Sequence, residues 1–137
     1  MPPGWQPSRR DRTDLGSSFS RTLTGAVFVV AGLLHFLVPS AYQKIMPPYL
    51  PLHHELIYLS GAMEVAGGMG LLSNHTRRVA GLALILLLLA VMPANVQMLL
   101  DAHAAGKSSW WVVLLWLRLP LQLVLVAWVW KVSRLRV

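Results

Sequence analysis

The sequence lacks cysteine and contains few charged residues. None of its 137 residues is cysteine, which excludes disulfides, thiolate catalysis, iron–sulfur clusters and cysteine-ligated zinc. Asp, Glu, Lys and Arg make up 12% of the chain, whereas they account for about a quarter of an ordinary soluble domain. The low charge therefore excludes a soluble domain, and it equally argues against a disordered chain, a coiled coil and a nucleic-acid-binding arm.

The composition of the chain is strongly apolar. Hydrophobic residues make up 55% of the chain, and the mean hydropathy is +0.56. A net charge of +7 can point to a nucleic-acid partner. Here, however, the basic residues lie between long apolar runs, a placement that indicates orientation in a membrane. We therefore expect the lipid bilayer as the partner, and no nucleic acid.

Four windows of the sequence are almost free of charge, and each is about as long as a helix needs to cross a bilayer. They are Thr22 to Val38, about Leu56 to Leu72, Val79 to Leu100 and Trp110 to Trp130. Short connections between them place neighbouring helices antiparallel. Small residues let helices approach closely in lipid, so the glycines of the first two spans are expected to serve packing, namely Gly25, Gly32, Gly61, Gly67, Gly68 and Gly70. The sequence thus predicts an all-α integral membrane protein, an antiparallel four-transmembrane-helix bundle. Residues 21–137 form this domain, and residues 1–20 are expected to be a flexible cytoplasmic tail.

The positive-inside rule predicts that both termini are cytoplasmic. Nine basic residues fall on one side of the bundle, namely Arg9, Arg10, Arg12, Arg21, Arg77, Arg78, Lys131, Arg134 and Arg136. Only Lys44 and Lys107 fall on the other. Arg9 and Arg10 also resemble a twin-arginine signal, but Val38 to Ala41 is a weak cleavage site, so a cleaved leader is the less favoured alternative.

Two ionisable residues lie within the predicted spans, Glu64 in the second and Arg118 in the fourth. Each is eight residues from the outer end of its span, which places both at a depth of roughly 12 Å. A charge within a span is unfavourable unless it is paired, and it is a functional hypothesis by default. We therefore expect Glu64 and Arg118 to form a buried ion pair.

Other polar residues fall in the same half of the bundle. Helical spacing brings His35, Asn95 and Gln122 toward Glu64 and Arg118, so these five residues are the candidate ligand-binding site. Pro93 and Pro120 should kink their helices beside this layer and open it outward. Below it, residues such as Phe28, Val29, Leu84, Ile85 and Leu88 should pack into a dry plug. The segment Met46, Pro47, Pro48 and Tyr49 is expected to lie across the mouth as a lid.

Structural alternatives remain open for the same residues. Glu64 and Arg118 could serve only to specify the fold, while Asn95 and Gln122 satisfy carbonyls that the prolines free. An ion or proton path is a further alternative. A metal site built from His35, His53 and His54 has less support, because adjacent histidines do not define a ligand set, and we expect no metal.

Several segments, in order along the chain, resemble the DoxX-like family of small bacterial membrane proteins. They are Gly32-Leu33-Leu34-His35-Phe36 with Pro39, Ile45-Met46-Pro47-Pro48, Ser60-Gly61-Ala62-Met63-Glu64 with Gly67-Gly68, Pro93-Ala94-Asn95, and Arg118-Leu119-Pro120-Leu121-Gln122. The resemblance spans about Arg21 to Val132. It implies a four-helix fold in the cell inner membrane and, loosely, a redox role, because some members are subunits of thiosulfate:quinone oxidoreductases or of other membrane-bound oxidoreductases. Distant vertebrate relatives assist the assembly of neurotransmitter receptors.

Two functions are therefore weighed. The first is a binding or partner subunit, in a redox complex or as a homo-oligomer, that holds a hydrophobic or quinone-like ligand in an outward-facing polar pocket. Quinone enters through the resemblance alone, and no other cofactor is evident. The second is a stand-alone membrane enzyme with His35 or Glu64 as acid or base, or an assembly factor for another membrane protein. We favour the first, because the sequence shows no nucleophile or cofactor motif.

Overall fold

The described part of the chain folds into six helices. The computed structural model describes residues 4, 6 and 8–134, and the side chains of residues 10–15 are not described. The helices are α1 (Arg9–Leu37), α2 (Pro39–Gln43), α3 (His53–Leu72), α4 (Arg77–Ala90), α5 (Met92–Ala104) and α6 (Ser109–Arg134). No strand occurs among these residues. The predicted all-helical class is confirmed.

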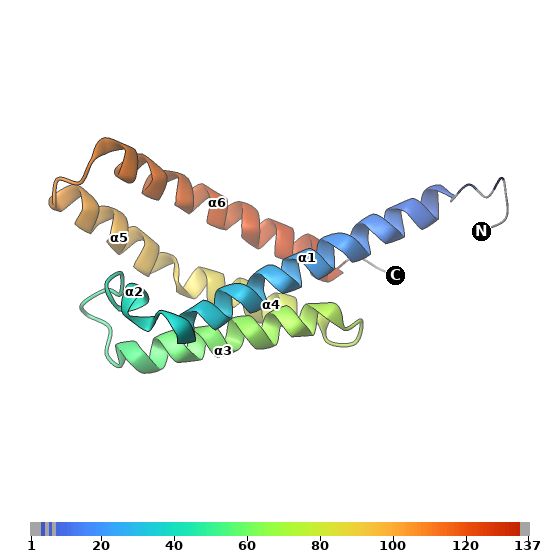
Figure 1. The fold of residues 1–137 in the computed structure, drawn as a ribbon, viewed down its shortest axis with the longest axis horizontal. Coiled ribbons are helices and arrows are strands. Elements are labelled where there is room, and N and C mark those ends of the chain that lie inside the picture. Colours follow the sequence, from blue (N-terminus) through green and yellow to red (C-terminus); the bar gives the residue numbers. More distant parts are fainter. Residues whose placement is uncertain (1–3, 5, 7, 135–137) are drawn as a thin grey trace.

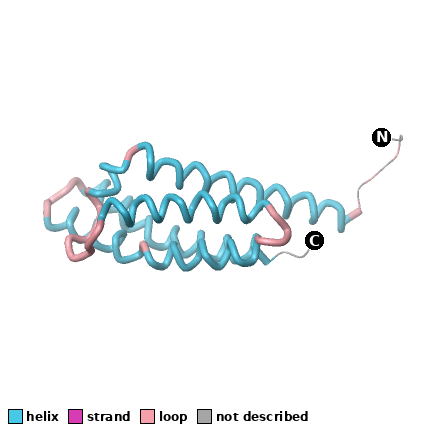
Figure 2. Tube along the Cα trace, turned by 90° about the horizontal axis from the view of Figure 1, so that it is seen from below, coloured by secondary structure: helices cyan, strands magenta, loops and turns pink. Residues whose placement is uncertain are grey.

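The long helices lie roughly along one common axis and form a bundle (Figures 1 and 2). Helix α1 packs against α3, α3 against α4, and α6 against both α4 and α5. Helix α1 begins, and α6 ends, at the same end of the bundle. At the opposite end, the α5–α6 hairpin diverges from α1 and α3, as Figure 1 shows.

Two glycine pairs set the close approach of α1 and α3. A Cβ atom added to Gly25 would lie 2.7 Å from the carbonyl oxygen of Gly68, and one added to Gly32 would lie 2.6 Å from that of Gly61. No side chain fits at such distances, so only glycine lets the two backbones touch. The expectation that these glycines serve packing is confirmed.

A break separates α4 from α5 at Val91. Pro93 follows it within the first turn of α5. Proline lacks an N–H group and cannot complete the helical hydrogen bonds of the preceding turn, which explains why the long apolar segment is interrupted here. Helix α6, by contrast, continues through Pro120 without interruption.

Three helical segments among the described residues are long and apolar enough to cross a membrane. They are Gly16–Leu37, Arg77–Ala104, which combines α4 and α5, and Ser109–Arg134. They correspond to the first, third and fourth predicted spans, whereas α3, the second, does not reach the same hydropathy. Helix α1 begins at Arg9, inside the predicted tail, whose first residues lie largely outside the described ones.

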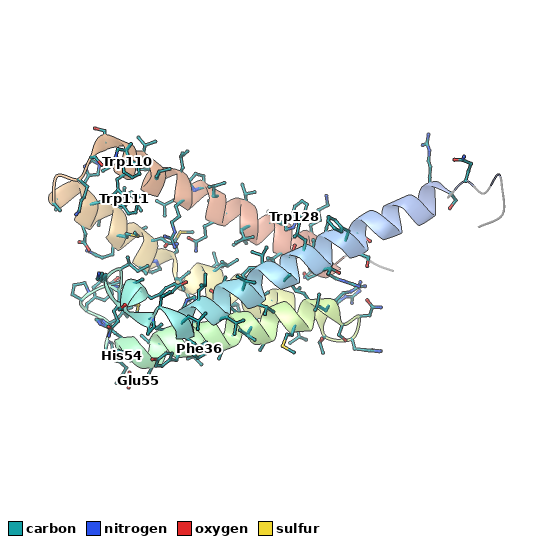
Figure 3. The ribbon with its side chains drawn as sticks, viewed as in Figure 1. Phe36, His54, Glu55, Trp110, Trp111 and Trp128 are labelled. Carbon is teal, nitrogen blue, oxygen red and sulfur yellow. The ribbon has the colours of Figure 1, made fainter. Side chains whose placement is uncertain are left out.

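Large apolar side chains cover the outside of the bundle, as a membrane segment requires. Val79 is 71% exposed and Leu121 is 64% exposed. Trp110 and Trp111 lie at one end of α6 and Trp128 toward the other (Figure 3). This arrangement agrees with the aromatic residues found at both edges of membrane spans.

Two apolar clusters form the interior. The larger contains Phe28, Leu71, Ala80, Leu84, Leu88 and Val129, and the smaller contains Leu99, Ala102 and Leu115. The larger cluster includes Phe28, Leu84 and Leu88 of the predicted dry plug, and Ile85 packs against it, whereas Val29 is not part of it. It closes the bundle on the side where α1 begins, and the polar residues lie beyond it.

Candidate functional site

A cavity of about 220 Å³ brings together four of the five predicted site residues. His35 from α1, Glu64 from α3, Asn95 from α5 and Arg118 from α6 all line it. Gln122 is not part of the lining. The cavity therefore has polar groups on four different helices.

His35 and Glu64 meet because α1 and α3 touch through glycine. Gly32 lies one turn before His35, and Gly61 lies three residues before Glu64, so the contact between the glycines brings the two side chains together. His35 Nδ1 is 3.8 Å from Glu64 Oε2 and 3.0 Å from the carbonyl oxygen of Ala31. A carbonyl only accepts hydrogen bonds, so we place a hydrogen on Nδ1.

The predicted Glu64–Arg118 ion pair is wrong. The ion-pair contact of Glu64 is with His35, whereas Arg118 is exposed and its Nη1 lies 3.8 Å from the sulfur of Met98. Equal depth does not fix lateral position: α6 packs on α4 and α5, and it diverges from α3 at this end. Both charges nevertheless line one cavity.

Glu64 retains an unused hydrogen-bonding atom. Its Oε2 is buried and has no hydrogen-bond partner among the described residues. A buried carboxylate oxygen without a donor is unfavourable, because water is no longer available to solvate it. A ligand with an O–H or N–H group in the cavity would supply the missing donor.

Tyr42 is a site residue that the sequence analysis did not include among the candidates. Its ring stacks on His35, with ring centres 3.9 Å apart, and it lines the same cavity. Burial raises the pKa of the Tyr42 phenol, the Glu64 carboxylate raises it further, and Arg118 opposes the shift. The hydroxyl therefore stays protonated and able to donate. Pro39, at the start of α2, was the signal in the sequence that a short helix begins there. This helix places the Tyr42 ring at the site.

Asn95 and Gln122 form a chain of hydrogen bonds beneath the cavity. Asn95 Nδ2 donates to Gln122 Oε1, and Gln122 Nε2 donates to the carbonyl oxygen of Leu88. Leu88 lies just before the break between α4 and α5. Gln122 thus satisfies a buried carbonyl beside the break, whereas the carbonyl that Pro93 leaves without its helical donor is that of Leu89. Asn95 also faces the cavity.

The predicted lid lies against the site in part. Met46 lines the cavity, and Pro47 is buried, with its carbonyl oxygen accepting a hydrogen bond from His53 Nε2 at 3.2 Å. Pro48 and Tyr49 are exposed. The segment is therefore anchored at Met46 and Pro47, and its opening and closing remain a prediction.

A second, larger and more apolar cavity adjoins the first. Its volume is about 490 Å³, and it lies between α3 and the α4–α5 segment. The two cavities share Met46, Leu56, Ser60, Val91 and Ala94. Leu59 and Leu86, which also line the second cavity, are 57% and 66% exposed on the outside of the bundle. The polar cavity thus adjoins an apolar one whose lining reaches the outer surface.

The sequence analysis did not identify the apolar cavity. The available signal was Pro93, because a helix break separates neighbouring turns and leaves space beside it. Pro93 lines this cavity.

The histidines do not gather into a metal site. His53 contacts Pro47, and His54 Nε2 lies 2.7 Å from Gln43 Nε2. Both histidines therefore contact residues other than His35. Within the described ranges, no group of three or more His, Asp or Glu side chains could hold a metal ion.

Comparison with known proteins gives a family but no activity. No curated protein and no solved structure matches the chain. A family model described as a domain of unknown function, DUF8561, matches residues 24–133, nearly the whole stretch that contains the helices of the bundle. The chain therefore belongs to the DUF8561 family.

Proposed function

We propose that this chain is a binding subunit of the cell inner membrane that holds an amphiphilic, quinone-like ligand. In this proposal four helices cross the bilayer with both termini in the cytoplasm, and α3 is the second span, beside the three more apolar segments. The start of α1 and the end of α6 lie at the same end of the bundle, and this end carries most of the basic residues. Their position supports the proposed orientation. The two adjoining cavities carry the ligand proposal.

The polar cavity suits a headgroup that can both donate and accept hydrogen bonds. Glu64 Oε2 lacks a donor, so a hydroxyl of the ligand would bind there. Arg118 has only donors to offer and would bind a carbonyl oxygen or an anion. A quinone carries the carbonyl and its reduced form carries the hydroxyl, so this ring fits both requirements. The resemblance to DoxX-like proteins points to the same ligand class.

The apolar cavity suits the tail of the same molecule. A tail that leaves the polar cavity past Ser60 and Ala94 would enter the apolar one directly. It would then reach Leu59 and Leu86 at the surface, where lipid chains would surround it. Ligand pockets commonly combine an apolar wall with a few convergent polar groups. The protein would thus present a membrane-soluble molecule to a partner redox protein.

Filling the junction between the cavities tests the proposal. Ser60→Met adds bulk where the cavities join, and Ala62→Met adds the same side chain at an exposed position of the same helix. The probe is a benzoquinone with a ten-carbon chain, titrated into detergent-purified protein by calorimetry. We expect Ser60→Met to weaken binding at least tenfold, equivalent to about 1.4 kcal/mol, and Ala62→Met to leave it unchanged.

A matched pair of variants tests the polar cavity. Glu64→Gln keeps the shape but removes the carboxylate, and Glu55→Gln makes the same change at the exposed start of α3. The reduced, hydroxyl-bearing form of the probe should lose affinity in the first variant only. Equal binding by all four variants would refute the ligand site. Conversion of the probe by the purified protein, lost in His35→Ala, would instead indicate a stand-alone enzyme.

A further inference from the structure

The end of the bundle opposite the ligand cavities carries an unbalanced group of cations. Its basic side chains are Arg21, Arg77, Arg78, Lys131 and Arg134, and none forms an ion pair with a described residue. Glu55 lies at the far end of α3 (Figure 3), and Asp101 accepts a hydrogen bond from Gln97 near the end of α5. The described acidic residues therefore do not neutralise this end.

Arg77 is the most unusual member of the group because it is buried. Its side chain is 7% exposed, and Nε and Nη1 have no hydrogen-bond partner among the described residues. The positive charges of Arg21 and Arg78 act on it as well. Arg21 itself donates to Asn74 Oδ1 at 2.7 Å, but its Nε also lacks an acceptor. Buried guanidinium groups without a counter-charge favour an anion nearby.

A pocket of about 380 Å³ lies between α4 and α6 at this end of the bundle, and it is lined by the neighbouring Arg78 rather than by Arg77. Arg78 and Leu82 come from α4, and Trp130, Ser133 and Arg134 come from α6. Leu82 lies one turn further into its helix than Arg78, and Trp130 lies one turn further into its helix than Arg134. Each helix thus offers a cation at its end and an apolar side chain one turn deeper.

The two arginines are oriented and placed for a phosphate group. The guanidinium of Arg134 packs on the ring of Trp130 at 3.4 Å from the ring centre, and such stacking leaves the N–H edge free to bind oxygen. Arg78 lies in the first turn of α4, which has no acidic residue and no side-chain cap. The dipole of α4 therefore adds to the attraction for an anion.

We propose that this pocket binds the phosphate headgroup of an anionic phospholipid. The phosphate lies between Arg78 and Arg134, and the start of an acyl chain lies on Leu82 and Trp130. The combined α4–α5 segment and α6 are each long and apolar enough to span a membrane, so the start of α4 and the end of α6 would lie at the level of the headgroups. Free phosphate shares the charge but leaves the apolar wall of the pocket unused.

Native mass spectrometry of the full chain in an uncharged detergent tests the site. The probes are phosphatidylglycerol, phosphatidylcholine with the same chains, and inorganic phosphate. We expect retention of phosphatidylglycerol, with affinity reduced about fivefold by Arg78→Gln and again about fivefold by Arg134→Gln. Because both side chains are exposed, these variants should fold, which circular dichroism checks. Arg78→Lys should retain most of the binding.

Lys131→Gln is the matched control. It removes one charge from the same end of α6, but Lys131 lies over Trp128 and does not line the pocket. The variant should change phosphatidylglycerol binding less than twofold. An equal loss in Lys131→Gln, or equal binding of phosphatidylcholine, would show nonspecific attraction and overturn the proposal. Inorganic phosphate that binds as well as the lipid would overturn the lipid assignment.

Discussion

Replacing Gly32 with alanine would show whether the glycine contact between α1 and α3 maintains the polar cavity. A Cβ atom at Gly32 would lie 2.6 Å from the carbonyl oxygen of Gly61 and 2.8 Å from the backbone nitrogen of Val65. Both atoms belong to the backbone and cannot rotate away, so α1 has to move away from α3. Overpacking of this kind costs about 1–3 kcal/mol.

The matched control is Gly16→Ala in the same helix, where an added Cβ meets nothing within 4 Å. Alanine is favoured over glycine in a helix interior by about 1 kcal/mol, and both variants gain this term. The difference between them therefore isolates the contact, and Gly32→Ala should be less stable than Gly16→Ala by about 1–3 kcal/mol.

Unfolding of the detergent-purified variants, followed by circular dichroism, measures this difference. Gly32→Ala should also weaken binding of the quinone probe, because the shift of α1 carries His35 away from Glu64. Identical unfolding curves for the two alanine variants would refute the reasoning, since they would mean that the helices do not touch at Gly32.

Three further results are expected. In a double-mutant cycle, His35→Ala and Glu64→Ala should couple by about 0.5–3 kcal/mol in unfolding free energy. The effects of Arg118→Leu and Glu64→Ala should be additive. Coupling of Glu64 to Arg118 alone would contradict the observed pairing. Gln122→Leu should cost about 1–3 kcal/mol in thermal unfolding, because it removes the donor to the buried carbonyl beside the α4–α5 break. A reporter fused after Arg134 should be active only as a cytoplasmic one, and periplasmic activity would disprove the proposed orientation.

Composition and periodicity predicted the all-helical class and four of the five residues that were expected to meet at one cavity. The spacing of polar residues along each helix predicted that His35, Glu64, Asn95 and Arg118 converge, and they line one cavity. Helical periodicity defines which face of a helix points inward, and rise per residue defines depth. Those two quantities account for the convergence.

The lateral arrangement of the helices could not be predicted in the same way. The pairing of Glu64 with His35 depends on which helices touch, and the glycine contact between α1 and α3 decides that. The glycines were recognised as packing residues, but their spacing alone does not name the partner helix. The role of Tyr42 depends on the return of α2 toward α1, and the apolar cavity depends on the break at Val91; neither has a regular period in the sequence.

Photoaffinity labelling most directly tests the central claim that one amphiphile occupies both cavities. The probe is the same benzoquinone with a diazirine in its alkyl chain, and mass spectrometry maps the modified residues. We predict labelling of Leu59, Met63 and Leu86, which line the apolar cavity, and its loss in Ser60→Met. Labelling spread equally over the exposed face of α6, at residues such as Val124, would contradict the account.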